Sequence, residues 1–296
     1  MKKQISFTGQ GRRADIGELL IHRILPNRYA EAVGSFVFLD HFGPIEHAPG
    51  QPRMKEGTGA HPHRGIATLT YLLAGEAEHF DSRGHRARIH SGGIQWMKAG
   101  NGIIHDEAIN PDSQTGGSVV HGFQFWINLP SAVKREEPEY FSVQAEEVPT
   151  TQLSENRGWL KVIAGQYEGL VSKIPSYSKQ YLYHIHLNAG KQFVLETESG
   201  LEYAAFLPLH DAIINDTPLS TGDFIEFDRN GGTIEFSNGS ETAVDIILFG
   251  GEPYAEPIVA QGPFVMNSQQ EIAKAYTEFF AGKYREIDYS VAEVHH

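Results

Sequence analysis

The sequence contains no cysteine among its 296 residues. This absence excludes disulfides, thiolate metal ligands, the usual iron–sulfur clusters and a cysteine nucleophile. Any metal bound by this chain must therefore be held by nitrogen and oxygen ligands. The restriction favours histidine and carboxylate side chains as candidate ligands.

Positive charge and long apolar runs are also scarce. Lys and Arg number 24 against 37 Asp and Glu, which gives a formal net charge of −13. This charge opposes a phosphate backbone, so we expect no direct contact with nucleic acid. No run approaches the roughly 20 apolar residues that cross a bilayer, and the N-terminal residues Met1–Ser6 are not followed by the apolar segment of a signal peptide. We expect a soluble, cytoplasmic protein without membrane contact.

Glycine and proline are abundant, with 31 Gly and 15 Pro spread among short runs of β-branched and aromatic residues. This texture is typical of an all-β sandwich or barrel. Strands are expected in the first half at residues 34–39, 66–74, 75–81, 94–98, 103–109 and 119–129. In the second half they are expected at residues 160–164, 180–187, 192–195, 203–207, 223–227, 232–236 and 244–249. The polar stretch 145–157 separates the halves, so we predict domains at residues 1–145 and 158–296.

One helix is expected near the C-terminus. Residues 268–271 read Ser-Gln-Gln-Glu, which is the form of a capping box. The following apolar residues share one helical stripe before Gly282: Ile272, Tyr276, Phe279 and Phe280. We predict that this helix is part of the second domain and docks on the β body through the stripe, with partner binding as the alternative.

The motif His-Pro-His at residues 61–63 is followed by His-Asp-Glu at residues 105–107. Side chains two apart on a strand point to the same face, so each motif can aim two ligand atoms inward. The apolar residues Leu69 and Tyr71 have the same parity as His63, which indicates that the histidines lie on the core-facing side. Three imidazoles and one carboxylate suit one divalent transition ion and leave coordination positions open. The alternative is a set of ordinary hydrogen-bonding histidines.

A second His-x-His motif occurs at His184 and His186, but no His-x-Glu follows at a matching distance. A lone motif of this kind is more often structural than metal-binding. We therefore expect one metal ion per chain, held in the first half.

Several successive motifs resemble the pirin family. They are residues 61–65, 72–75, 94–97, 99–107 and 121–130 in the first half, and 250–253, 256–258 and 262–267 near the C-terminus. The resemblance implies an all-β protein of two tandem cupin domains, each a jelly-roll β-barrel. It also implies one metal ion in the N-terminal barrel only, held by His61, His63, His105 and Glu107. The ion expected from the resemblance is iron, as Fe(II), with Mn, Co, Ni, Zn and Cu as alternatives.

The resemblance extends to the quercetin 2,3-dioxygenases, which implies ring cleavage of a small, flavonol-like aromatic substrate by dioxygen. Glu107 is then the candidate catalytic residue, because a carboxylate beside the ion can also accept the hydroxyl proton of the substrate. The alternative function is an iron-containing, redox-sensitive protein that regulates a transcription or metabolic partner by binding it.

Five further residues are candidates for the surroundings of the metal. His121 is expected either to hydrogen-bond to a metal ligand or to be an ordinary strand histidine. An apolar wall for an aromatic substrate is expected from Phe42, Met97, Phe123 and Phe125, with plain core packing as the alternative for each.

Overall fold

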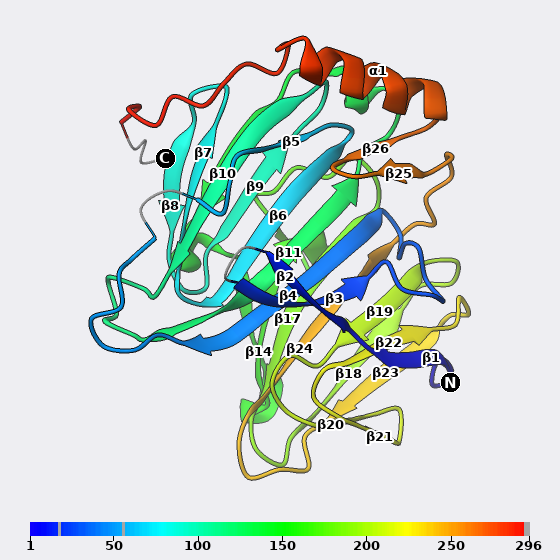
Figure 1. Ribbon diagram of the computed structural model, residues 1–296. Helices are drawn as coiled ribbons and strands as arrows, with labels where there is room; N and C mark the ends of the chain where they lie inside the picture. The colour runs from blue at the N-terminus through cyan, green and yellow to red at the C-terminus, as the bar shows by residue number, and fades with distance from the viewer. Residues whose placement is uncertain (17–18, 55–56, 293–296) are drawn as a thin grey trace. The chain divides into compact units, whose positions relative to one another are not determined.

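The computed structural model describes residues 1–16, 19–54 and 57–292 of the chain. Strands dominate these residues, and the one α-helix among them is α1 (Gln269–Phe280), close to the C-terminus (Figure 1). Three short 3-10 turns also occur, at η1 (Val133–Arg135), η2 (Ala145–Glu147) and η3 (Ser154–Asn156). The predicted all-β fold with a short C-terminal helix is confirmed.

The chain divides into two compact units that alternate along the sequence. The first unit, as we name it here, contains residues 13–22, 38–147 and 255–296, and the second contains residues 1–12, 23–37 and 148–254. The division near residue 147 agrees with the polar stretch that the sequence shows there. The two chain ends, however, are exchanged relative to the predicted ranges 1–145 and 158–296. This exchange depends on strand pairing and packing by the ends, which composition does not reveal.

Two sheets carry most of the first unit. Their strand orders are β12-β9-β6-β11-β4-β3-β2 and β5-β10-β7-β8. The larger sheet contains β2 (Arg12–Ile16), β3 (Leu19–Leu25), β4 (Phe36–Glu46), β6 (Ile66–Ala74), β9 (Ile94–Lys98), β11 (Val119–Asn128) and β12 (Glu139–Val143). The smaller sheet contains β5 (His61–His63), β7 (Glu76–Asp81), β8 (Arg86–Ile89) and β10 (Ile103–Asn110). A two-stranded hairpin, β25 (Val259–Gln261) with β26 (Phe264–Met266), precedes α1.

The second unit repeats this architecture, with strand orders β1-β22-β19-β24-β17-β14-β13 and β18-β23-β20-β21. The larger sheet contains β1 (Ile5–Gln10), β13 (Thr150–Leu153), β14 (Gly158–Ala164), β17 (Gln180–Leu187), β19 (Glu202–Phe206), β22 (Asp223–Phe227) and β24 (Val244–Gly251). The smaller sheet contains β18 (Gln192–Thr197), β20 (Ala212–Ile214), β21 (Thr217–Leu219) and β23 (Gly232–Ser237). A short hairpin joins β15 (Gln166–Tyr167) to β16 (Leu170–Val171).

The interior of the first unit changes from apolar to polar along β10. Ile109 packs against an apolar cluster of buried side chains: Ile21, Phe42, Leu72, Ala77, Ile89 and Val120. Glu107 and His105 follow on the same face at steps of two residues, because strand side chains alternate between faces. Polar side chains therefore gather beyond the apolar cluster, and this is where the candidate site lies.

Helix α1 docks on the first unit. Ser268 caps its N-terminus by accepting a hydrogen bond from the Glu271 amide, as the capping box predicts. Ile272 and Ala275 are buried and pack in one cluster with residues of β26 and with Tyr284. Phe280, by contrast, is 79% exposed, so its predicted place in the docked stripe is wrong. Eight residues beyond Ile272 it is rotated by roughly 80° around the helix axis.

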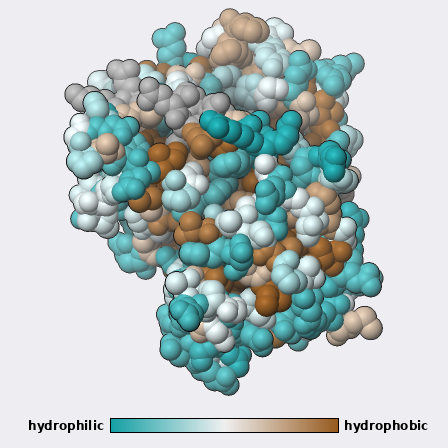
Figure 2. Space-filling model, turned by 60° about the horizontal axis from the view of Figure 1, so that its bottom comes forward, coloured by the Kyte–Doolittle hydropathy of each residue, from teal (hydrophilic) through white to brown (hydrophobic). Residues whose placement is uncertain are grey.

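Within the described part of the chain, no helix has the length and apolar character needed to cross a membrane. On the face drawn in Figure 2, hydrophobic residues form small groups among hydrophilic ones.

Candidate metal centre

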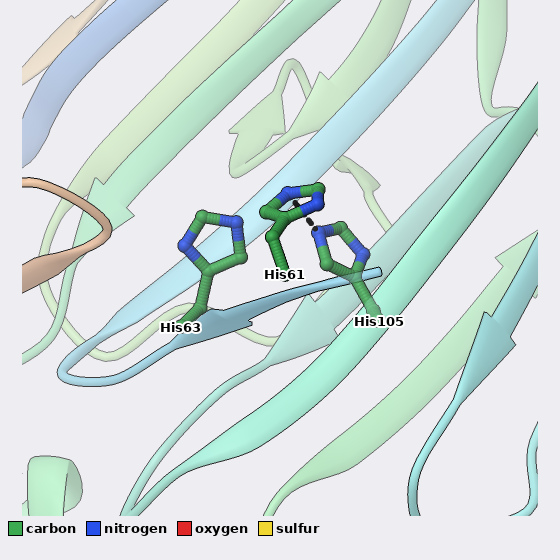
Figure 3. A group of neighbouring side chains, drawn as sticks. All are labelled: His61, His63 and His105. Atoms are coloured by element: carbon green, nitrogen blue, oxygen red, sulfur yellow. Dashed lines mark hydrogen bonds between the residues drawn. The ribbon is translucent and has the colours of Figure 1, made fainter. Parts of the chain in front are cut away.

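Three histidines of the first unit converge on one point. β5 and β10 pair antiparallel, with His61 opposite His105 and His63 opposite Ile103. The ring centroids are 4.5 Å apart for His61 and His105, and 4.9 Å apart for His63 and either of the others. Figure 3 shows the three imidazoles facing one another, and the Nε2 atoms of His61 and His105 are 3.0 Å apart. One ring nitrogen from each residue lies within 4.8 Å of the other two.

Backbone carbonyls set the orientation of two of these rings. The Nδ1 atom of His61 bonds to the Gly59 carbonyl at 2.8 Å, and that of His63 to the Pro263 carbonyl at 3.1 Å. A carbonyl oxygen only accepts, so Nδ1 carries the proton in both rings and Nε2 keeps its lone pair. Partners of this kind commonly hold metal-ligating histidines in place. Both rings are thus prepared as nitrogen ligands.

Metal binding also requires neutral imidazoles, and burial keeps two of these rings neutral. Burial, helped by the neighbouring His61 and opposed by the hydrogen bond to the Pro263 carbonyl, lowers the pKa of His63 to about 3. Burial, followed by the neighbouring histidines, also holds the pKa of His105 well below its ordinary value. These imidazoles are neutral at pH 7, as a ligand must be. Neutral rings with facing nitrogens fit a bound cation, and the buried His105 Nδ1 has no hydrogen-bond partner among the described residues.

Glu107 lies beside this trio, at the next inward position of β10. Its Oε1 accepts hydrogen bonds from Thr70 Oγ1 at 2.8 Å and from Gln95 Nε2. Its ligand oxygen lies within 4.8 Å of ring nitrogens of His79 and His105. The structure therefore places Glu107 in a second group that shares His105 with the trio. Coordination by all four predicted ligands stays a prediction.

His79 is a candidate site residue that the sequence analysis missed. It lies on β7 directly opposite Glu107, and its ring centroid is 5.6 Å from that of His105. The ring stacks on Tyr140 at 4.2 Å, and Nε2 bonds to Asp81 at 3.1 Å. Its place opposite Glu107 depends on the register of β7 against β10, which the sequence does not contain.

Asp81, the last residue of β7, accepts several hydrogen bonds. One of its oxygens accepts from the ring nitrogens of His79 and His85, and the other from the amides of Arg83 and His85. Burial alone would raise the pKa of Asp81, but the hydrogen bonds from His79 and His85 outweigh it and hold the pKa below its ordinary value. The charged carboxylate therefore stabilises the fold above pH ~3.9, and this stabilisation is lost as the pH falls further.

We expect Asp81→Asn to lower the free energy of unfolding at pH 7 by about 2–3 kcal/mol, because several bonds to a buried charge are weakened. Denaturant unfolding at pH 7 and near pH 3, in one metal state, measures the difference between variant and wild type. The difference should shrink at the acidic pH. A difference that is equal at both pH values would mean that the carboxylate charge contributes nothing.

Two of the predicted wall residues face away from the site. On β11, Gln124 bonds to Thr70, and the ring of Trp126 lies 4.8 Å from that of His63. Alternation along the strand then places Phe123 and Phe125 on the opposite face, where both are fully buried. Trp126, which the sequence analysis did not select, is the aromatic ring beside the trio.

Of the other three predicted residues, one lies beside the site and two lie away from it. Met97 is fully buried and shares the face of Gln95 on β9, next to Glu107. Phe42 belongs to the apolar cluster beyond Glu107. His121 lies against His41, with their Nε2 atoms 2.8 Å apart. It is five residues from Trp126 along β11, which is roughly 16 Å at strand spacing.

The chain turns sharply between the first motif and the residues whose parity was compared with it. Gly65, with a φ of 81°, ends β5 and the chain re-enters as β6 in the other sheet. Thr70 rather than Leu69 or Tyr71 consequently faces Glu107. The histidines do face the interior, but parity cannot be carried through this turn.

His184 and His186 have a different environment from the first motif. Both rings bond to Asp245 Oδ1, at 2.9 and 2.7 Å. The alternate residues of β17, Tyr183 and Ile185, belong to the core of the second unit. The two histidines therefore point to the other face of their sheet.

The C-terminal segment reaches the site at two places. The Pro263 carbonyl accepts a hydrogen bond from His63. The Tyr289 hydroxyl donates to Asp106 Oδ2 at 2.9 Å. Asp106 Oδ1 in turn accepts from the amide of Gly59, the residue whose carbonyl holds His61. Both histidines of β5 are thus positioned with help from residues 255–292.

Comparison with known proteins identifies relatives over nearly the whole length. The pirin family model matches residues 19–127, and the model of the pirin C-terminal cupin domain matches residues 182–285. A Pseudomonas aeruginosa protein named "Putative quercetin 2,3-dioxygenase PA2418" is 32% identical over 286 residues, covering 96% of this chain and 99% of that protein.

Solved structures give the same picture. A quercetin 2,3-dioxygenase from Acinetobacter baumannii superimposes with a TM-score of 0.88 and 29% identity, covering 97% of this chain and 100% of that one. The bacterial pirin YhhW from Escherichia coli, in complex with nickel(II), has a TM-score of 0.64 at 21% identity, over 84% of this chain and 99% of that one. At that identity the second comparison supports the fold alone.

Proposed function

The chain belongs to the pirin family, and from this membership we propose that it is a mononuclear metal-dependent dioxygenase that cleaves a flavonol-like substrate, as quercetin 2,3-dioxygenases do. Relatives that carry this enzyme name support the reaction class. The observation that carries the proposal is the trio of imidazoles with facing nitrogens, at His61, His63 and His105, of which the last two are buried.

These three histidines would hold the ion, with Glu107 as the fourth ligand. Nitrogen and carboxylate donors suit Fe(II), which we prefer, and also Mn, Co, Ni, Zn or Cu. When bound, the ion supplies a Lewis-acidic centre with open positions for a substrate hydroxyl and dioxygen.

The protein side of the reaction centres on Glu107. Thr70 and Gln95 both donate to its Oε1, which fixes the carboxylate, and no other described side chain donates to its Oε2. A carboxylate held this way can take the hydroxyl proton of an enolisable substrate. Met97 and Trp126 border the same face and offer apolar contact to an aromatic ring.

We expect Glu107→Gln to lose at least about 100-fold in turnover per bound metal, the lower end of what a general base contributes. The amide keeps an oxygen ligand but cannot accept a proton at neutral pH. Kinetics at equal metal loading separate the two roles, with the surface substitution Glu137→Gln as the matched control. Turnover per metal equal to that of wild type would refute the general-base role.

Oxygen consumption tests the proposed reaction as a whole. The metal-loaded chain should consume dioxygen and release carbon monoxide with quercetin, while the metal-stripped chain should do neither. A screen of flavonols and other enolisable aromatics that yields no oxygen consumption at full metal loading would refute the proposal. It would favour the redox-sensitive interaction protein instead.

A further inference from the structure

A cavity of about 870 Å³ opens into the second unit. Its wall comes from β17, β18, β19 and the loop 165–179, and contains none of the residues proposed to hold the metal. Sites for drug-sized molecules have volumes of about 300 to 1,000 Å³. We propose that this cavity is a second small-molecule site, for a neutral planar aromatic compound that carries both hydroxyl and carbonyl groups.

Four tyrosines make the wall aromatic: Tyr167, Tyr181, Tyr183 and Tyr203. Ring centroids are 5.3 Å apart for Tyr181 and Tyr183, 5.0 Å for Tyr181 and Tyr203, and 5.7 Å for Tyr167 and Tyr183. These are normal separations for tilted and edge-on aromatic contacts. A planar aromatic ligand would extend the same contacts, with Leu195 and Leu201 adding apolar surface.

The hydroxyl groups of the buried tyrosines select the ligand's polar groups. Tyr181 donates to the Glu202 carbonyl and Tyr183 to the Gln166 carbonyl, so their oxygens can only accept from a ligand. Tyr203 accepts from the Glu198 amide at 3.0 Å and, among the described residues, has no acceptor for its own proton. Tyr203 as a whole is only 5% exposed. A buried donor without a partner is costly, and a ligand carbonyl would satisfy it.

Charge favours a neutral ligand over an anion. Burial raises the pKa of Tyr167 to about 12, helped by Glu168, and also raises the pKa of Tyr181 and Tyr203. The phenols are therefore uncharged at pH 7. The wall carries three carboxylates, at Glu168, Glu196 and Glu198, against two lysines, at Lys173 and Lys179. Its net charge therefore disfavours an anion. At the edge of the cavity, Lys179 is paired with Glu198, so the lysine's charge is compensated.

The cavity is built before any ligand arrives. Ser172 fixes the loop, because its amide donates to the Gly165 carbonyl at 2.9 Å and its hydroxyl to the Ile163 carbonyl at 2.7 Å. The same hydroxyl accepts from the Ile174 amide. A wall held in this way loses little entropy on binding. Protein interiors are otherwise packed densely. A preformed, tyrosine-lined cavity of this size is therefore better explained as a ligand site than as a packing defect.

The test uses full-length, metal-loaded protein and 7-hydroxycoumarin at pH 6.5, where this neutral probe carries a hydroxyl and a lactone carbonyl. Fluorescence titration should show saturable binding, with unsubstituted coumarin weaker and coumarin-3-carboxylate weaker still. Tyr203→Phe keeps the ring and removes the free donor, so binding should weaken by about tenfold. Val171 lines the cavity and is 61% exposed, so Val171→Trp should obstruct the opening without disturbing the core, and abolish binding.

His63→Ala is the control that separates this site from the metal centre, and it should leave probe binding unchanged. Quercetin turnover should likewise be unchanged in Tyr203→Phe and Val171→Trp, so failure of the proposed reaction and failure of this site are distinguishable. Binding that survives Val171→Trp, or that disappears in His63→Ala, would overturn the second site. So would equal binding of hydroxylated and unsubstituted coumarin.

Discussion

His63→Ala is expected to abolish both metal retention and oxygen-dependent activity. His63 is fully buried, and its ring stands within 4.9 Å of both other histidines, centroid to centroid. Loss of the hydrogen-bonding partners of a ligand alone costs about 10- to 100-fold in metal affinity. Loss of the ligand itself should therefore cost more than about 100-fold. Metal content after extensive dialysis, near one ion per chain in wild type, measures the effect.

His184→Ala is the matched control, because it removes a histidine from the other His-x-His motif. Its ring is already hydrogen-bonded to Asp245 on the opposite face of its sheet from the core residues of β17. We expect this variant to keep its metal and its activity. Full metal content in His63→Ala, or loss of metal in His184→Ala, would contradict the proposed ligand set.

Removal of residues 263–296 is expected to unfold the first unit rather than merely weaken it. Four large side chains of the segment are buried in one cluster, against which Ile104 of the remaining chain packs: Phe264, Met266, Ile272 and Tyr284. At about 1.5–3 kcal/mol each, their loss approaches the 5–15 kcal/mol that stabilises an ordinary domain. Buried partners on the body, such as Arg64 and Lys134, also lose their hydrogen bonds to this segment.

Thermal unfolding and solubility of the truncated chain measure this effect, and metal uptake by any soluble fraction provides a second reading. Since His63 loses its carbonyl partner, uptake should fall as well, which the sequence alone did not suggest. Phe280→Ala is the control, because its side chain is exposed and should change stability by no more than about 0.5 kcal/mol. An unchanged melting temperature after truncation would show that the segment does not stabilise the body.

Much of the fold follows from local pattern. The strands expected at 66–74, 94–98 and 180–187 coincide with β6, β9 and β17. Glycine turns and runs of β-branched residues mark these strands within a few residues of sequence. They can therefore be predicted from this one sequence. The cap of α1 at Ser268 is equally local.

Other features required pairing between distant segments. The edge strand β1 pairs with β22 more than 200 positions away, and His79 reaches the site only through the register of β7. Likewise, Phe123 and Phe125 were expected as an apolar wall with core packing as the alternative, because the sequence could not tell which face of β11 meets the histidines. Such facts depend on three-dimensional pairing, which spacing along the chain leaves open.

The bond between His63 and the Pro263 carbonyl joins residues 200 positions apart in the sequence. During synthesis, the ribosome makes His61, His63 and His105 early, then the whole of residues 148–254, and only afterwards the segment that fixes the His63 ring. Chains are synthesised at about 5–20 residues per second. Pro263 is therefore added roughly ten seconds or more after His63. With the proposed ligand set, the site should reach its full metal affinity only after release of the finished polypeptide. Metal loading would then report on completion of the chain.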